Sequence, residues 1–361
     1  MKSTPLITQK PGNTPIGGIP LDYFPNNCGF WLKLFKGFDK GKKLFFRDSS
    51  HGNGNPGSTI VFIHGNPECS YTYRKIIKSL INTAKKPFRI INVDHIGFGL
   101  SDQATYEMVC MDHCRNLFQL IKILDLKNVT LVVHDWGGPI GIGALLKEPY
   151  RLSSLIILNS TVFPLSKEGK TYKNYPISWL GWARGPHIIP NHFWGSFSSF
   201  AIFLKPLKPI KLLLNMLKYL LLAELNIFPC ENLIFRKLVR LQFRSKLNTL
   251  SSKRLVLQTP YWGYGNTYKE PKLGKRSTKE FYHFIQQHIK KDWGSRGQNI
   301  GVKLVFGAWD AVCKKSVIKQ WLENLPQLKG SIKVFKDETH FIQETKANYI
   351  ADKIIEIADL K

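Results

Sequence analysis

The stretch that decides the fold reads Leu131-Val132-Val133-His134-Asp135-Trp136-Gly137-Gly138. An apolar run from Val129 to Val133 meets a polar turn and two glycines, after which an apolar helical pattern begins. This pattern predicts a strand, a very tight turn and the start of a helix. Such a turn pushes its middle side chain, here Asp135, out above the sheet, and the small residues behind it let the helix and the strand pack closely.

The identity of the residue at the turn has two interpretations. Turns of this kind usually hold a serine, and an aspartate in that place changes the chemistry without changing the geometry. A carboxylate is already ionised at neutral pH, so Asp135 could attack carbon without a base to deprotonate it. In the simpler interpretation, Asp135 only caps the helix that begins at Gly137. The other strand ends decide between the two.

Strands and helices alternate around this turn. The predicted strands are Trp31–Phe38, Lys43–Arg47, Thr59–Ile63, Phe88–Val93 and Leu155–Leu158, and the predicted helices are Tyr71–Asn82 and Tyr106–Leu124. Short strands that are apolar throughout are typical of parallel strands buried on both faces. The alternation therefore predicts an α/β fold, with a mostly parallel sheet and helices on both of its faces.

The alternation stops after Asn159. Residues from about Thr161 to Pro260 show apolar helical stretches, and they contain fifteen lysines and arginines against three glutamates. The strand pattern resumes at Val302–Phe306 and Ser331–Phe335. We therefore expect an inserted helical cap over residues 161–260, a main domain formed by residues 31–160 and 261–361, and an irregular, Pro/Gly-rich arm over residues 1–30.

The cap is unusually rich in large apolar side chains, which predicts a helical lid over Asp135 whose inner wall is a wide apolar pocket. The side chains behind this prediction are Trp179, Trp182, Phe193, Trp194, Phe197, Phe200 and the leucines of Leu212–Leu222. In the alternative interpretation, these aromatic residues simply pack the cap against the main domain.

Four strand ends carry side chains with useful chemistry. Asn66, Asp135, Asp310 and His340 each follow a predicted strand. Taken singly, Asn66 could be a turn residue, Asp310 a helix cap and His340 a surface-loop histidine. Because the carboxyl ends of parallel strands meet at one edge of the sheet, we expect all four to lie together. In chain order they provide an amide, a carboxylate nucleophile, an acid and a histidine.

Four motifs carry a resemblance to a known family. They are His64-Gly65-Asn66-Pro67, the loop from Asp94 to Asp102, His134-Asp135-Trp136-Gly137-Gly138, and His340-Phe341-Ile342-Gln343-Glu344. Together they resemble the haloalkane dehalogenases, which have the α/β-hydrolase fold. The resemblance covers Leu44–Leu158 closely and Val302–Glu344 more loosely. The sequences of Asp94–Gly97 and Leu158–Phe163 are most similar to one branch of the family. That branch contains the bacterial cis-3-alkyl-4-acyloxetan-2-one (β-lactone) decarboxylases of long-chain olefin synthesis.

The resemblance implies a role for each matching residue. Asp135 would be the nucleophile that forms a covalent ester, His340 the base that activates water against it, and Asp310 the acid that orients His340. The Asn66 amide and the Trp136 indole would stabilise the leaving anion, and the backbone N–H groups of these two residues would hold the oxyanion. The substrate would be a small apolar molecule, either a haloalkane or a long-chain β-lactone. Neither a metal nor a cofactor is implied, whereas assembly with other olefin-synthesis enzymes is left open.

Other functions remain as alternatives. An epoxide hydrolase would share the turn and would need proton donors from the cap, for which Tyr172, Tyr175 and Tyr219 are candidates. Asn66 argues against it, because epoxide hydrolases generally carry an apolar residue there. Asp135 argues against a serine esterase. The remaining alternative is a non-catalytic protein that uses its basic charge to bind an anionic surface.

The charge of the chain is strongly positive, with a formal net charge of +27 and an isoelectric point of about 9.8. This charge is spread over the whole chain without a nucleic-acid-binding motif, so we predict no nucleic-acid partner and leave weak contact with an anionic membrane surface open. Polar residues interrupt the most apolar segment, Ile210–Phe228, which argues against a membrane span. The first thirty residues lack an apolar core run, so a cytoplasmic protein is predicted.

The cysteines do not predict a metal site. Cys110, His113 and Cys114 would share one face of a helix, but a fourth ligand is not found in the sequence. Ordinary reduced, partly buried cysteines are the preferred interpretation.

Overall fold

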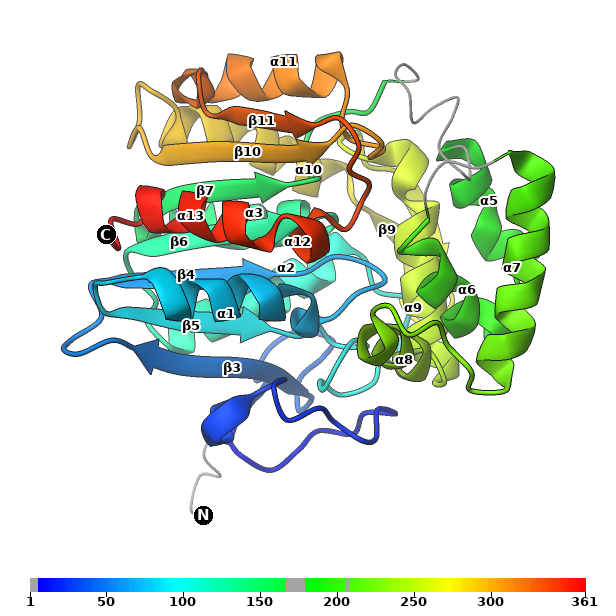
Figure 1. The fold of residues 1–361 in the computed structure, drawn as a ribbon. Coiled ribbons are helices and arrows are strands. Elements are labelled where there is room, and N and C mark those ends of the chain that lie inside the picture. The colour runs from blue at the N-terminus through cyan, green and yellow to red at the C-terminus, as the bar shows by residue number, and fades with distance from the viewer. Residues whose placement is uncertain (1–5, 167–178, 205–207) are drawn as a thin grey trace.

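A nine-stranded sheet forms the centre of the computed structural model, which describes residues 6–166, 179–204 and 208–361 (Figure 1). The strand order is β1-β2-β3-β5-β4-β6-β7-β10-β11. The strands are β1 (Ile7–Thr8), β2 (Gly29–Lys33), β3 (Lys43–His51), β4 (Ser58–Ile63), β5 (Phe88–Val93), β6 (Val129–His134), β7 (Leu152–Leu158), β10 (Gly301–Gly307) and β11 (Ile332–Phe335).

The sheet is antiparallel from β1 to β5 and parallel from β5 to β11. Every residue of β4 and of β6 is buried. Such strands are covered by helices on both faces, which is why their sequences are apolar runs rather than alternating patterns. The structure therefore has the mostly parallel sheet that the sequence predicts.

Helices cover both faces of the sheet (Figure 1). One face carries α1 (Arg74–Thr83), α12 (Ile342–Thr345) and α13 (Ala347–Ile357), and the other carries α2 (Cys110–Ile123), α3 (Gly137–Leu145), α10 (Lys279–His288) and α11 (Lys315–Asn324). Short 3-10 turns lie at Pro25–Asn27, Ser70–Tyr73, Pro149–Arg151, Asn191–Phe193, Thr259–Tyr261 and Pro326–Leu328, and a π-helical turn lies at Ile289–Trp293.

Five further helices gather at the end of the sheet toward which the parallel strands point (Figure 1). They are α5 (Trp179–Ile188), α6 (Trp194–Ala201), α7 (Pro209–Glu224), α8 (Leu233–Gln242) and α9 (Lys246–Leu257). All five fall within residues 161–260, and we refer to them as the cap. Side chains from α8 and α9 bond to loops of the sheet, as when Gln242 donates to the carbonyl of Pro67.

A two-stranded antiparallel sheet of β8 (Thr267–Glu270) and β9 (Gly274–Ser277) follows the cap, and sequence analysis does not predict it. Arg276 of β9 makes a bidentate ion pair with the buried Asp112 of α2, with N–O distances of 2.6 and 2.9 Å. This pair ties the hairpin to α2.

Two predicted boundaries need correction. The arm over residues 1–30 is not wholly irregular, because Ile7–Thr8 pairs with β2, which itself begins at Gly29. The helix predicted from Tyr106 begins only at Cys110. The backbone N–H groups of Glu107 and Met108 instead donate to Glu270 and to Ser251 of the cap. Tertiary hydrogen bonds have thus replaced the first predicted turn of this helix.

The prediction for the cap leucines is wrong for those on the outer side of α7, whereas Leu212 and Leu220 pack against the hydrophobic core. Leu213, Leu214, Leu217 and Leu221 of α7 point outward and are exposed, so they line no inner wall. The apolar face of α7 that packs inward is formed by other residues of the same helix. Among the aromatic residues named with them, Trp194, Phe197 and Phe200 are buried, and the side chains of Trp179 and Trp182 lie outside what the structure describes.

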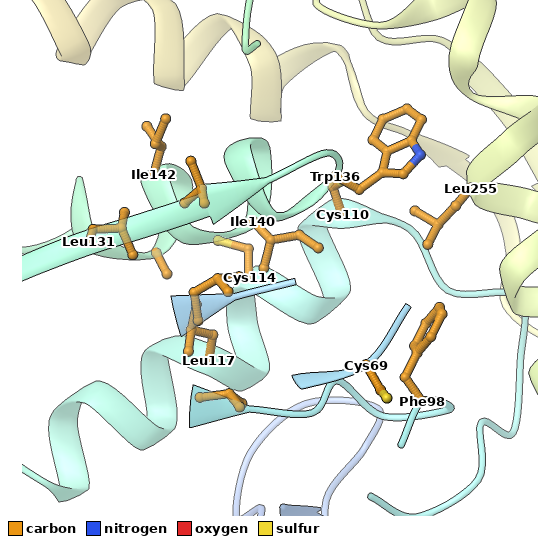
Figure 2. Packing of buried hydrophobic residues seen from close by; sticks show 14 of the residues in the cluster. Cys69, Phe98, Cys110, Cys114, Leu117, Leu131, Trp136, Ile140, Ile142 and Leu255 are labelled. Carbon is orange, nitrogen blue, oxygen red and sulfur yellow. The ribbon is translucent and has the colours of Figure 1, made fainter. Parts of the chain in front are cut away.

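The hydrophobic core runs without a break from the sheet to the cap. Figure 2 shows this cluster from Leu117 of α2 and Leu131 of β6 to Trp136, whose indole points toward Leu255 of α9. The turn that follows β6 therefore lies where the core of the main domain meets the cap.

Candidate active site

Asp135 stands on the sharp turn between β6 and α3. Its backbone φ is +51°, a left-handed conformation that is uncommon for a residue with a side chain. The neighbouring chain leaves no room for larger residues: a Cβ on Gly65 would collide with the Asp135 carboxylate, and one on Gly137 would collide with the carbonyl of Ile63. The two glycines allow the turn to press against the end of β4.

The Asp135 carboxylate is buried, with 6% of the residue exposed. Its Oδ2 accepts a hydrogen bond from the backbone N–H of Asn66 at 2.8 Å, and the backbone N–H of Trp136 also acts on the carboxylate. Burial raises the pKa of Asp135 to about 6, although the nearby His340 and His134 lower it. The carboxylate is thus charged at neutral pH in an apolar setting and has two backbone donors beside it.

His340 lies between two carboxylates. Its Nε2 is 3.8 Å from Asp135 Oδ1, and its Nδ1 is 2.5 Å from Asp310 Oδ2. Burial alone would lower the pKa of His340, but the charge of Asp310, its hydrogen bond and the charge of Asp135 outweigh burial and raise that pKa to about 9. The structure therefore brings together Asp135, Asp310 and His340, which lie 30 or more residues apart in sequence.

A buried network holds the loop of His340. His134 bonds to Glu68 with an N–O distance of 2.5 Å, and its other ring nitrogen is 2.9 Å from the carbonyl of His340. Burial opposes ionisation of Glu68, but His134 and a backbone donor hold its pKa below the usual value. Asn159 donates to the same carbonyl of His340 at 2.7 Å. These groups fix the main chain of His340 without touching its ring nitrogens.

The amide of Asn66 is held in one orientation by the cap. Its Oδ1 accepts a hydrogen bond of 2.6 Å from the hydroxyl of Ser252 on α9, and that hydroxyl in turn accepts one of 2.9 Å from the indole of Trp194 on α6. The Nδ2 of Asn66 is buried and has no hydrogen-bond partner among the described residues. Since an unpaired buried donor is costly, this amide is ready to receive an acceptor.

Trp136 is held by a second tryptophan. Its ring stacks on Trp262 with centroids 3.8 Å apart and an interplanar angle of 16°, and the indole of Trp262 donates to the carbonyl of Thr161 at 2.6 Å. Within the described part of the chain, the indole N–H of Trp136 has no hydrogen-bond partner. Asn66 and Trp136 therefore both carry an available N–H next to Asp135 in the fold.

Sequence reasoning missed the residues that support this site. None of these supporting residues lies in the four motifs from which the site was predicted. They are Ser252, Trp194, Trp262, Glu68 and Asn159. Asn159 stands one residue after a strand, which was a usable signal, whereas a serine inside an amphipathic cap helix carries none.

The tyrosines proposed for epoxide chemistry are Tyr172, Tyr175 and Tyr219. Tyr172 and Tyr175 lie outside the described residues. The Tyr219 hydroxyl lies 3.0 Å from the hydroxyl of Ser199, so it bonds within the cap.

The cysteines that were predicted to share one face of a helix, Cys110 and Cys114 of α2, are free and buried. Burial raises the pKa of Cys114 to about 11.

Comparison with known proteins agrees with the fold. Residues 58–188 match the family described as the alpha/beta hydrolase fold. The structure of a tetrameric haloalkane dehalogenase from Paraglaciecola agarilytica superimposes with a TM-score of 0.64 at 20% sequence identity, covering 95% of this chain and 97% of that one. The chain has the α/β-hydrolase fold. The expected fold class is therefore confirmed.

Curated relatives of this chain have two names. A cis-3-alkyl-4-alkyloxetan-2-one decarboxylase from Shewanella oneidensis is 40% identical over 129 residues, which cover 35% of this chain and 38% of the relative. A haloalkane dehalogenase from Agrobacterium fabrum is 36% identical over 105 residues, covering 29% and 32%. The chain thus spans less than two fifths of the length of these relatives. The resemblance to both groups is confirmed. The name of the decarboxylase relative has a 4-alkyl substituent on the lactone ring, where the sequence analysis expected a 4-acyl substituent.

Proposed function

We propose that this α/β hydrolase is an enzyme that uses Asp135 to displace an anion from carbon, on a haloalkane or a long-chain β-lactone. The observation that carries the proposal is the unpartnered, buried amide N–H of Asn66, held by Ser252 beside a buried aspartate. A donor that is fixed in advance and has no acceptor in the part of the chain that the structure describes suits a negative charge that develops during reaction.

In the first step, an Asp135 oxygen attacks the substrate carbon and forms a C–O bond. The bond from that carbon to the leaving group breaks, and the leaving group departs with the electron pair as a halide or, in a β-lactone, as the ring carboxylate. The amide of Asn66 and the indole of Trp136 would donate to this anion. The product of the step is an ester on Asp135.

In the second step for a haloalkane, His340 removes a proton from water while the water oxygen attacks the ester carbonyl. The backbone N–H groups of Asn66 and Trp136, which act on the carboxylate in the resting structure, would hold the oxyanion. Ester formation removes the charge of Asp135, one of the charges that raise the pKa of His340. The imidazole therefore loses its proton more readily at the stage at which a base is needed.

Turnover of three substrates by the purified protein tests the proposal. A brominated alkane, a long-chain β-lactone and an aryl epoxide are compared side by side. We expect turnover of the alkane or the lactone, whereas turnover of the epoxide alone would overturn the assignment. Turnover of substrates of increasing chain length then distinguishes a short haloalkane from a long-chain β-lactone. If the pocket holds only compact ligands, activity should fall beyond about four to six carbons, and the long-chain substrate would be wrong.

The rate of ester formation is expected to fall about tenfold per pH unit as the pH drops below about 6. Burial raises the pKa of Asp135 to about 6, and only the ionised carboxylate attacks. Rapid quenching and mass measurement of the ester across pH values provide the profile. In His340→Gln the midpoint should move upward, because the charge that lowers the Asp135 pKa is gone. A midpoint near 4 in both proteins would contradict this account.

Ser252→Ala is expected to lower kcat about fivefold to tenfold, because the Asn66 amide loses the hydrogen bond that fixes its orientation, a bond worth about 1 kcal/mol. The matched control is Ser251→Ala, whose hydroxyl accepts from Met108 instead. In an Asn66→Ala background, Ser252→Ala should have no further effect on kcat. An equal effect in both backgrounds would show that Ser252 acts only on the fold.

A cytoplasmic location, assembly with other olefin-synthesis enzymes and the division into arm, main domain and cap stay predictions. A tetramer is known for the Paraglaciecola structure, and sedimentation of the purified protein would show the oligomeric state of this chain.

A further inference from the structure

The outward face of α7 carries a continuous apolar stripe. Its side chains recur at helical spacing and are exposed by half or more: Ile210 by 77%, Leu213 by 52%, Leu214 by 62%, Leu217 by 54% and Leu221 by 65%. Leu225 and Ile227, just beyond the helix, are exposed by 63% and 54%. Single exposed leucines are ordinary, whereas a contiguous apolar patch of this kind marks an interaction site. We call these residues the α7 stripe.

Packing within the cap does not require the α7 stripe. The opposite side of the same helix already supplies the contacts that hold it, since Tyr219 and Ala223 are buried and Leu212, Met216 and Leu220 pack against the hydrophobic core. Figure 1 places α7 at the outer edge of the cap, on the side away from the sheet. Helix α7 is therefore apolar on two sides, and only one of them has a partner in the described chain.

Positive charge lies beside the α7 stripe. Lys208, Lys211 and Lys218 are exposed, and none makes an ion pair with a described residue. At 100° per residue, Lys211 and Lys218 lie along one edge of the stripe. The acid on this helix, Glu224, is paired with Arg240 at 3.2 Å. Residues 161–260, within which the cap falls, contain fifteen lysines and arginines against three glutamates.

This combination selects one kind of occupant. A helix with an apolar face and lysines at its edge lies in the interface of a bilayer, where the lysine heads reach the headgroups and anionic lipids attract them. A second copy of this chain is disfavoured, since each copy carries a net charge of +27. Among the described residues, no helix has the length and apolarity to cross a bilayer.

We propose that α7 docks the cap on the surface of an anionic lipid bilayer, with the α7 stripe in the interface and Lys211 and Lys218 at the headgroups. The helix lies in the plane of the membrane and does not cross it. The docking is separate from the proposed reaction on Asp135, because none of the residues that form it belongs to the candidate active site.

Co-flotation of the full-length protein with vesicles tests this docking. Vesicles of phosphatidylcholine with phosphatidylserine should carry the protein, and vesicles of phosphatidylcholine alone should carry at least about tenfold less. Binding should weaken as salt is added, because salt screens the lysine charges. The variant Asp135→Asn should bind as well as the wild type, so that a failure of the proposed chemistry leaves this test intact.

Two sets of substitutions locate the docking surface. Leu213→Gln, Leu217→Gln and Leu221→Gln together keep helix-forming side chains and should weaken binding at least about tenfold. Lys211→Glu with Lys218→Glu should do the same, whereas the charge-matched control Lys315→Glu with Lys319→Glu on α11 should not. Circular dichroism and thermal melting check that each variant is folded.

Three outcomes would overturn the proposal. In the first, phosphatidylserine vesicles fail to bind the wild type. In the second, the glutamine variant binds as tightly as the wild type. In the third, sedimentation shows a dimer that the glutamine substitutions dissolve, which would make a second copy of the chain the occupant of the α7 stripe.

Discussion

His340→Gln is expected to leave substrate-derived mass attached to Asp135 and to lower hydrolytic turnover by about 10²–10⁴, the usual contribution of a general base. Attack by Asp135 does not need a base, because the carboxylate is ionised above about pH 6. Hydrolysis of the ester does need one, and His340 is the imidazole 3.8 Å from the Asp135 carboxylate. Intact mass and peptide mass after incubation with a bromoalkane measure the adduct.

The matched control for this variant is His283→Gln, which changes an exposed histidine on α10. It should turn over substrate like the wild type and retain no adduct. Absence of an adduct in His340→Gln with both the bromoalkane and the β-lactone would contradict the covalent mechanism. A β-lactone ester could also break down by losing carbon dioxide, with Asp135 as the leaving group, so breakdown of that ester alone would contradict only the role of His340 with this substrate.

Much of the fold follows from short apolar runs in the sequence. The strands β4 and β6 are buried on both faces, so their sequences have no polar alternation and are easily found. Because parallel strands end at one edge, residues just past them meet. This is why Asp135, Asp310 and His340 could be predicted to lie together, and the structure places the His340 ring between the two carboxylates.

The support of the site could not be predicted in this way, because it comes from contacts between the cap and the main domain. Ser252 lies 186 residues after Asn66, and nothing in its helical neighbourhood marks it. The stack of Trp262 on Trp136 likewise depends on how the chain returns from the cap. Such contacts depend on tertiary packing, whereas periodicity reports only the local backbone.

The orientation of α7 is a second feature that could not be predicted from the sequence composition. Its leucines are correctly recognised as helical and apolar, but composition does not say which side of a helix faces inward. Spacing separates Leu213, Leu217 and Leu221 from Leu212 and Leu220. Two apolar stripes on one helix cannot both face the core, so the helix needs a second partner, which composition alone does not indicate.

Asn66→Ala is expected to lower the rate of ester formation by about 10²–10³, the usual cost of removing one fixed donor to a developing anion. The donor is the Nδ2 of Asn66, which is buried and has no partner in residues 6–166, 179–204 and 208–361. Hydrolysis of the ester should continue at its normal rate, because the backbone N–H of residue 66 is still present to hold the oxyanion. Pre-steady-state measurement of both steps separates the two rates.

The leaving group separates this role from a loss of structure. Halides that leave poorly need more stabilisation, so Asn66→Ala should slow a chloroalkane more than the matching iodoalkane. A variant that merely disturbed the fold would slow the reactions of both haloalkanes equally. Asn66→Ala also leaves the Ser252 hydroxyl without its acceptor, and that loss would affect both haloalkanes equally. Near-normal turnover of a haloalkane or β-lactone by Asn66→Ala would remove the amide from the reaction. The apolar residue typical of epoxide hydrolases would then fit this position as well, and epoxide opening would become the function to test.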